Sequence, residues 1–569
     1  MQVMRLCLIL TILLVAYMLA LLVYIVPYGW LIPVVLVVGM LTKNTQRFTS
    51  MGSARWANLR DIPHLLGGDG LIVGHISEKL NKLDAVKALF DRRISARDAC
   101  QKFLLSCQRS QSDQLVRLNA ATHTAVFAPT GVGKGVSCVI PFLLTNTDSC
   151  VVVDLKGELA TVTAEARRKM GHTVVLLDPY RAVTQEPDSF NPIDFIDPDS
   201  DLALDDVRDL AAAFVVRTGM EKEAHWNDSA ELWIGAMIAL LVHFRLKTAG
   251  NMTELKRLLS DLSMMQQAIV KMIESDEWGG ALSRVGHQLT HFQSKELNSV
   301  LTTISRHLAF VDTPAIAGST KSSSFDPADL LTGKMTVYLI LPPNRMKAQA
   351  GLLRMWISSM FAAVIRGGVQ NERNIHFILD ECASLGKLDV LNDAIDKYRA
   401  FGIRLQMYFQ SLGQIKACFP EDQGQTLLSN TTQVFFGVND YETAEHVSKR
   451  LGEETIIVNE GGENTGRSTQ YSDHASPSKG SSGGASTSWK QQARRLLKPE
   501  EVTGLWQRIA ISFCPGVPPL WTTLTRYYEG GFNKSSSIGL MRAVVDTTCL
   551  FVGTALMAVA LTFVILKGE

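Results

Sequence analysis

The 569-residue sequence predicts an α/β fold in which helices flank a parallel β-sheet. Three observations predict it. Short apolar runs with helical patterns between them recur along the chain, which is typical of fully buried parallel strands. The first of these strands leads directly into a Gly-rich turn, and a later one ends in two carboxylates, Asp380 and Glu381. Because the carboxyl ends of parallel strands share one edge of a sheet, we expect a ligand site there.

Composition narrows the class of protein. Hydrophobic residues make up 46% of the sequence and charged residues 20%, a balance that indicates a membrane-embedded part. The net charge of +1 gives no overall basic field that would indicate nucleic acid, although a local basic patch is compatible with it. The nine cysteines form no Cys-x-x-Cys pair, which favours reduced thiols over a disulfide framework or a zinc site.

The N-terminal region carries a long uncharged stretch, residues 6–42. As one straight helix it would be about 55 Å long, against a hydrocarbon core of about 30 Å. Pro27 supplies a break, so we expect a transmembrane hairpin with two spans, 6–26 and 28–42. A cleaved signal peptide is the alternative, but the apolar stretch is too long for one. Basic residues from Lys43 onward place both ends of the hairpin in the cytoplasm by the positive-inside rule.

The Gly-rich turn, residues 128–135, lies between a predicted strand and a helix that starts near Lys134. Strand, turn and helix in this order are the context of a phosphate-binding loop, whose backbone N–H groups surround an anion at a helix N-terminus. Lys134 can then reach the outer phosphates of a nucleotide. The predicted nucleotide-binding residues are Ala128, Pro129, Thr130, Gly131, Val132, Gly133, Lys134, Gly135 and Val136.

The loop departs from the pattern Gly-x-x-x-x-Gly-Lys-Ser/Thr at two positions. Ala128 replaces the first glycine, and Gly135 replaces the hydroxyl residue that ordinarily binds Mg²⁺. Ser137 stands two residues further along the helix, which we expect to be too far to replace that hydroxyl. An ordinary Gly-rich strand–helix turn is therefore the alternative at this point of the chain.

Two further apolar runs, 149–154 and 174–178, predict buried parallel strands, and each ends in an aspartate. Asp154, Lys156 and Asp178 are thereby expected at the ligand-binding edge of the sheet.

Helical patterns replace strand patterns between residues 205 and 321, which predicts an inserted all-α domain of six helices. Within it, the apolar residues 232–244 are too few to cross a membrane and predict a buried core helix. His225, Trp226 and His291 lack metal-ligand spacing, so we interpret them as core and surface residues.

The strand pattern resumes after the insertion and carries the second chemical motif. The apolar run before Asp380 and Glu381 is typical of the Walker B motif, in which Asp380 would hold Mg²⁺ and Glu381 would polarise the attacking water. Gln410 ends the next strand and could sense the terminal phosphate or the water. Arg399 or Arg404 could act on a neighbouring subunit as an arginine finger; a solvated or salt-bridged arginine is the alternative.

The C-terminal region contains two unusual segments. Residues 460–488 are rich in Gly, Ser and Thr and poor in apolar side chains, which predicts a flexible loop. Residues 543–566 are apolar and long enough to span a membrane. The alternative for 543–566 is a hydrophobic helix packed on the chain's own core.

Between Gly52 and Tyr528 the sequence resembles the type IV secretion system coupling proteins, the conjugal-transfer TraG-like group. The resemblance rests on eleven motifs: GSARWA at Gly52, APTGVGKGVSCVIP at Ala128, DLKGEL at Asp154, DP at Asp178, SFNPID at Ser189, SSFDPADL at Ser323, YLILPP at Tyr338, LDECASLGKL at Leu379, YFQSLGQI at Tyr408, FGVNDYETAEHVSKRLG at Phe436 and LLKPEEV at Leu496.

This resemblance implies a multi-pass ATPase of the bacterial inner membrane, with its main domain in the cytoplasm. It implies ATP and Mg²⁺ as ligands and a homo-hexameric ring related to FtsK-like translocases. Implied partners are relaxase-bound single-stranded DNA, protein effectors and the inner-membrane components of a secretion channel. The domains would be a transmembrane hairpin (1–47), a RecA-like P-loop NTPase domain (48–204 and 322–540), the inserted all-α domain (205–321) and a C-terminal transmembrane helix (541–569), the last a departure from the family pattern.

The resemblance also implies roles for single residues. Lys134 would bind the phosphates, Asp380 would bind the metal ion and Glu381 would position the water. Gln410 matches the family's motif glutamine, and Arg399 matches its candidate arginine finger. Glycine at the position of Gly135 also occurs within this branch. Two functions stay open: a motor or gate that hydrolyses ATP, and a nucleotide-binding receptor with little hydrolysis. A third, an FtsK-like DNA translocase, is disfavoured by the helical insertion and the secretion-family motifs.

Overall fold

The computed structural model describes residues 49–79, 109–119, 121–217, 225–244, 250–370, 373–420, 422–472 and 475–529, together with Leu13 and Tyr17. The predicted spans 28–42 and 543–566, and all of 6–26 except two residues, therefore lie outside the described residues. Within the described part, one helix, Ala348–Arg366, is long and apolar enough to cross a membrane. Its most apolar window is 67% buried inside the protein, as expected of a core helix.

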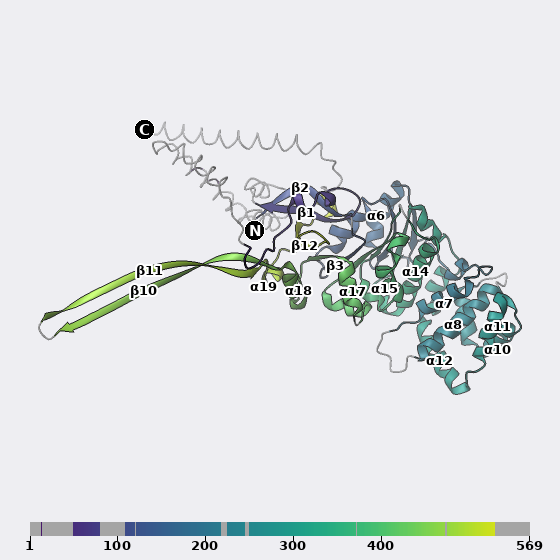
Figure 1. Ribbon diagram of the computed structural model, residues 1–569. Coiled ribbons are helices and arrows are strands. Elements are labelled where there is room, and N and C mark those ends of the chain that lie inside the picture. Colours follow the sequence, from purple (N-terminus) through teal and green to yellow (C-terminus); the bar gives the residue numbers. More distant parts are fainter. Residues whose placement is uncertain are drawn as a thin grey trace, which may run out of the picture.

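An eleven-stranded sheet in the order β2-β1-β13-β12-β9-β3-β8-β7-β4-β6-β5 forms the centre of the molecule (Figure 1). The seven strands from β9 to β5 are mutually parallel, which confirms the predicted fold class. They are β3 (His123–Phe127), β4 (Ser149–Asp154), β5 (Thr173–Leu177), β6 (Met335–Ile340), β7 (Ile375–Leu379), β8 (Ile403–Phe409) and β9 (Thr432–Phe436).

Four antiparallel strands extend this sheet beyond β9. They are β12 (Ile509–Phe513), β13 (Leu520–Thr523), β1 (Leu71–Lys79) and β2 (Arg109–Leu118). The N-terminal segment before the phosphate loop thus joins the sheet through residues from the far end of the chain.

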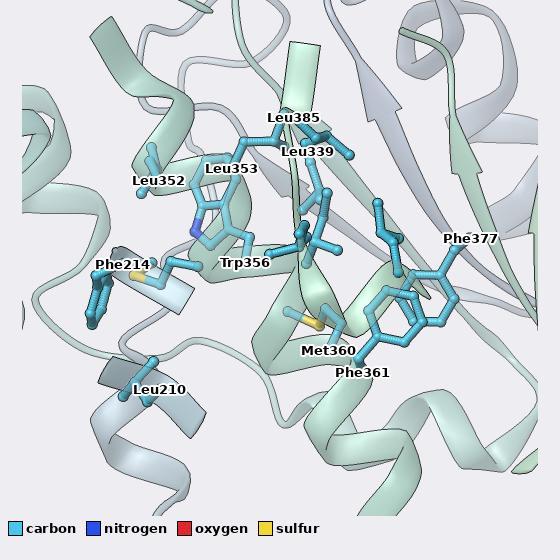
Figure 2. Close-up of a cluster of buried hydrophobic side chains, with 14 of the residues drawn as sticks. Leu210, Phe214, Leu339, Leu352, Leu353, Trp356, Met360, Phe361, Phe377 and Leu385 are labelled. Atoms are coloured by element: carbon cyan, nitrogen blue, oxygen red, sulfur yellow. The ribbon is translucent and has the colours of Figure 1, made fainter. Parts of the chain in front are cut away.

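Both faces of the sheet are covered, because successive strand residues point to opposite sides. Val151 and Val153 of β4 belong to one hydrophobic cluster, and Cys150 and Val152 to the other. On the first face α14 (Met346–Arg366) packs against the strands, and its Phe361 stacks on Phe377 with ring centroids 4.0 Å apart (Figure 2).

The second face carries α5 (Ile140–Leu143) and α6 (Glu158–Lys169). Other helices around the sheet are α15 (Asp389–Asp396), α16 (Ile415–Cys418), α17 (Gln423–Asn430), α18 (Tyr441–Leu451) and α19 (Pro499–Thr503).

The described chain between β5 and β6 is helical from α7 onward and contains each of the six predicted helices. They are α7 (Ala203–Phe214), α8 (His225–His243), α9 (Met252–Ser260), α10 (Leu262–Ile273), α11 (Glu277–Leu289) and α12 (Ser294–His307), followed by the short α13 (Pro314–Ser319). Trp233 to Leu240 of α8 are buried, as the apolar run predicts. These helices lie at one end of the molecule in Figure 1.

A long two-stranded ribbon, β10 (Glu453–Ser472) and β11 (Ala475–Arg495), projects from the other end (Figure 1). The prediction of a flexible loop at 460–488 is therefore wrong, since the described residues of this segment lie in two paired strands. Antiparallel pairing is made by backbone N–H and C=O groups. Every non-proline residue carries both groups, so a segment with small, polar side chains can still form paired strands. At its base, Ala54 N donates to Glu453 O at 2.9 Å, so the ribbon is tied to the segment that follows the predicted hairpin.

Candidate functional site

The predicted phosphate loop, residues 128–135, lies between β3 and a helix whose first turn, Gly135–Val139, is a π-turn. Gly131 (φ 85°) and Gly133 (φ 101°) both adopt left-handed backbone conformations, which side chains disfavour. The loop is anchored at its start, where Ala128 N donates to Phe409 O of β8 at 2.9 Å. The loop is therefore a tight, glycine-dependent turn at the carboxyl edge of the sheet, and its binding of an anion stays a prediction.

Lys134 is the basic group of this loop. Its Nζ donates to the carbonyl oxygen of Ala128 at 2.8 Å, so the ammonium lies over the loop's own backbone. Burial lowers the pKa of Lys134, and the charges of Glu381 and Asp380 oppose that shift. Lys134 thus faces the two carboxylates that the sequence pairs with it.

The missing hydroxyl at Gly135 leaves Ser137 as the next candidate. Ser137 is buried, and its Oγ lies 3.6 Å from where a Cβ on Gly133 would stand. Its backbone N–H donates to Gly133 O at 2.9 Å. The serine hydroxyl therefore lies beside Gly133, nearer to the loop than its sequence position suggests.

Glu381 follows β7 and is held by two amides. Gln410 Nε2 lies 3.3 Å from each of its carboxylate oxygens, and Gln414 Nε2 lies 3.4 Å from Oε1. Gln414 Oε1 in turn accepts from the backbone N–H of Gln410 at 2.7 Å. Because β8 lies between β3 and β7, Gln410, which directly follows β8, stands between the phosphate loop and Glu381.

Gln414 is a site residue that the sequence analysis misses. The signal for it is present in the motif YFQSLGQI, where a second glutamine follows Gln410 at a spacing of one helical turn.

Asp380 has the electrostatics of a cation ligand. Its pKa is raised to about 6, mainly by burial and also by the charges of Asp154 and Glu381, while Lys134 and Lys156 oppose the shift. Among the described residues there is no group of three or more His, Cys, Asp or Glu side chains that could hold a metal ion. Mg²⁺ at phosphate sites commonly uses one or two carboxylates and takes its other ligands from phosphates and water, so Asp380 beside the loop fits Mg²⁺.

The other two strand-end aspartates hold turns. Asp154 accepts from the backbone N–H groups of Lys156 and Ala160, at 3.2 and 2.8 Å. Asp178 accepts from three successive backbone N–H groups of its own turn, those of Ala182, Val183 and Thr184. Both carboxylates are buried and fix the backbone at the edge of the sheet.

The two candidate arginines lie at the opposite edge. Arg399 is exposed in the short turn before β8, and its carbonyl oxygen accepts from Arg404 Nη1 at 3.1 Å. Seven residues of β8, about 23 Å at the rise of a strand, separate Arg399 from Gln410. Arg399 is therefore remote from the phosphate loop of its own chain.

Comparisons with known proteins agree on one family. The model of the family described as "Type IV secretory system Conjugative DNA transfer" matches residues 55–547. The conjugal transfer protein TraG of Rhizobium radiobacter is 29% identical over 414 residues, 70% of this chain and 61% of that protein. Protein VirD4 of the same organism is 27% identical over 426 residues, 72% of this chain and 57% of that protein. The chain thus spans about 60% of the length of these relatives.

Solved structures of the plasmid coupling protein TrwB share the fold. Its complex with ADP and Mg²⁺ has a TM-score of 0.52 at 19% identity and covers 71% of this chain and 85% of that one. Its complex with the non-hydrolysable ATP analogue ADPNP has a TM-score of 0.52 at 18% identity, covering 81% of this chain and 96% of that one.

Proposed function

The chain belongs to the type IV secretory system conjugative DNA transfer family, and on that premise we propose that it is the ATP-hydrolysing coupling protein of a type IV secretion or conjugation system. The observation that carries the proposal is the placement of Glu381, held by Gln410 and Gln414 at the same edge as Lys134. A protein that only binds nucleotide has no chemical need for a carboxylate positioned in this way.

Each residue of the site has a distinct task in this proposal. The loop amides and Lys134 bind the phosphates, and Asp380 holds Mg²⁺. Glu381 accepts a proton from the attacking water, and Gln410 and Gln414 hold its carboxylate in position. A Mg²⁺ held by Asp380 would supply positive charge that stabilises the phosphates during hydrolysis. The TrwB complexes with ADP, Mg²⁺ and an ATP analogue support ATP and Mg²⁺ as the ligands.

The remaining features complete the proposal. The spans 6–26, 28–42 and 543–566 would anchor the chain in the bacterial inner membrane, with the sheet in the cytoplasm. A homo-hexameric ring would bring Arg399 of one chain to the phosphate loop of the next, which the exposed position of Arg399 supports. The cargo would be relaxase-bound single-stranded DNA or protein effectors, recruited with help from the helices between β5 and β6 and passed to the secretion channel.

The test is ATP turnover by the full chain in lipid nanodiscs, with and without single-stranded DNA. Lys134→Ala should abolish nucleotide binding, and Glu381→Gln should keep binding while turnover falls by at least about 100-fold. Glu442→Gln, an exposed glutamate on α18, is the matched control. Unchanged turnover in Glu381→Gln would refute the assigned role. ATP binding without turnover in assembled rings would favour the receptor function instead.

A further inference from the structure

Lys156 lies beside the catalytic edge but has no role in the function proposed above. It follows β4, the strand next to β7, and the two strands pair with Val153 opposite Leu379. Continuing this register sets Asp154 alongside Asp380, and Lys156 lies in the turn that directly follows Asp154. Neighbouring strands lie about 4.8 Å apart, and a lysine side chain easily spans that distance.

The two sides of Glu381 therefore differ. The sheet order places β8, with Gln410, on one side of β7 and β4, with Lys156, on the other. Gln410 and Gln414 supply neutral amides from the first side. Lys156 supplies the positive charge from the second.

The backbone that carries Lys156 is fixed. The Asp154 carboxylate accepts from Lys156 N–H and from Ala160 N–H in the first turn of α6. Gly157 has a φ of 71°, and a Cβ there would lie 2.3 Å from Val183 Cγ2. A glycine is thus favoured at this point, and the turn fixes the position of the Lys156 backbone.

The side chain of Lys156 is exposed, and no described residue forms a hydrogen bond or an ion pair with its ammonium group. Its charge nevertheless reaches the site, because it lowers the pKa of both Lys134 and Asp380. A cation held close to the catalytic carboxylates, but bonded to none of them, is available to an incoming anion.

We propose that Lys156 is a second cationic ligand of the terminal phosphate of ATP and gives the site its preference for ATP over ADP. The proposal rests on the nucleotide-binding function proposed above. If Glu381 activates water at the terminal phosphate, a group on the far side of Glu381 from the phosphate loop can reach that phosphate. The inner phosphates stay with the loop amides and Lys134, so ADP leaves Lys156 without a partner.

The experiment compares the Kd of Mg²⁺·ADP with that of a non-hydrolysable Mg²⁺·ATP analogue on the full chain in nanodiscs. In Lys156→Gln we expect affinity for the analogue to fall by about tenfold or more, since a charge-assisted hydrogen bond is lost. Affinity for ADP should stay within about twofold, and Lys156→Arg should restore most of the preference. Lys169→Ala, an exposed lysine at the other end of α6, is the matched control and should change neither affinity.

Equal weakening of both nucleotides in Lys156→Gln would overturn the proposal, because it would mean that Lys156 only balances the charge of Asp380. Unchanged affinities would overturn it as well. Failure of the wild-type chain to bind either nucleotide would refute the function proposed above, and with it this role of Lys156.

Discussion

The two edges of the parallel sheet carry similar residues but hold them differently. At the carboxyl edge, Lys156 is exposed and Glu381 is held by amide contacts of 3.3–3.4 Å. At the amino edge, Arg167 is fully buried, and its Nε donates to Thr336 Oγ1 at 2.9 Å. Its Nη groups donate to the carbonyl oxygens of Leu143, Asn146 and Asp148.

This difference separates a structural use of charge from a functional one. The charge of Arg167 is satisfied by the protein itself, so it joins α5, α6 and the starts of the strands into one unit. The charges at the carboxyl edge are only partly satisfied and leave capacity for a ligand, which is the pattern expected of a binding site. Substitutions at the amino edge should therefore change stability, and those at the carboxyl edge should change activity.

The largest effect is expected for Arg167→Leu. It removes the donors of several buried carbonyl groups, so we expect a loss of about 4 kcal/mol in the free energy of unfolding, measured by urea denaturation. Arg168→Leu is the control, since Arg168 is exposed and its ion pair with Glu165 is long at 3.8 Å. This substitution should lower the free energy of unfolding by less than about 0.5 kcal/mol. Equal losses in the two variants would contradict the structural role of the amino edge.

A smaller effect concerns the pH dependence of stability and His123. Its Nδ1 accepts from Leu405 N–H at 3.1 Å, and burial, with help from Arg404 and Arg399, lowers its pKa to about 4. Between pH 6.5 and 4 the unfolded chain, with a histidine pKa near 6.5, binds a proton that the native state does not bind. Stability should therefore fall as the pH drops from 6.5 through 4, by about 2 kcal/mol for this group.

The variant His123→Asn tests this assignment, because asparagine can keep the acceptor without titrating. Its urea midpoint should depend less on pH between 6.5 and 4 than that of the wild type. Parallel profiles for the two proteins would show that His123 does not cause the acid sensitivity.

The smallest effect is expected at the carboxyl edge for Gln414→Ala. Loss of one amide loosens Glu381 without removing it, so kcat should fall by about tenfold with KM for ATP nearly unchanged. The stability should stay within about 0.5 kcal/mol, measured by urea denaturation. Gln425→Ala, an exposed glutamine on α17, is the control. If Gln414→Ala lost much stability but kept a normal kcat, the carboxyl edge would have a structural role and not a functional one.

Much of the site is predictable because it is built from strand ends. The apolar runs before Asp380 and Gln410 fix where those strands stop, and parallel strands bring their ends together. The task of Asp154 is less predictable, since a carboxylate at a strand end can bind a ligand or hold a turn. Its backbone partners at Lys156 and Ala160 become visible only in three dimensions.

Pairing between distant segments is the part that sequence patterns miss. β1 pairs with β13, where His75 lies opposite Thr523, and no local pattern links residues so far apart. The ribbon of β10 and β11 escapes prediction for another reason, because hydrophobic periodicity reports the burial of side chains and not backbone pairing. Arg399 shows a third limit of sequence patterns. It precedes β8, so the direction of that strand places it at the amino edge, away from the phosphate loop of its own chain.

The burial of α14 has a consequence for the biogenesis of the protein. This helix is synthesised before β7 and β8, so its apolar surface is uncovered while the ribosome completes them, and Phe377 is not yet present to cover Phe361. Lateral entry of α14 into a lipid bilayer at that moment would invert everything downstream and separate Lys134 from Glu381 by a membrane. Arg354 near its centre opposes such entry by about 2.5–3.5 kcal/mol. In the folded protein the same guanidinium donates to Leu385 O at 3.0 Å and so holds the segment that follows Glu381.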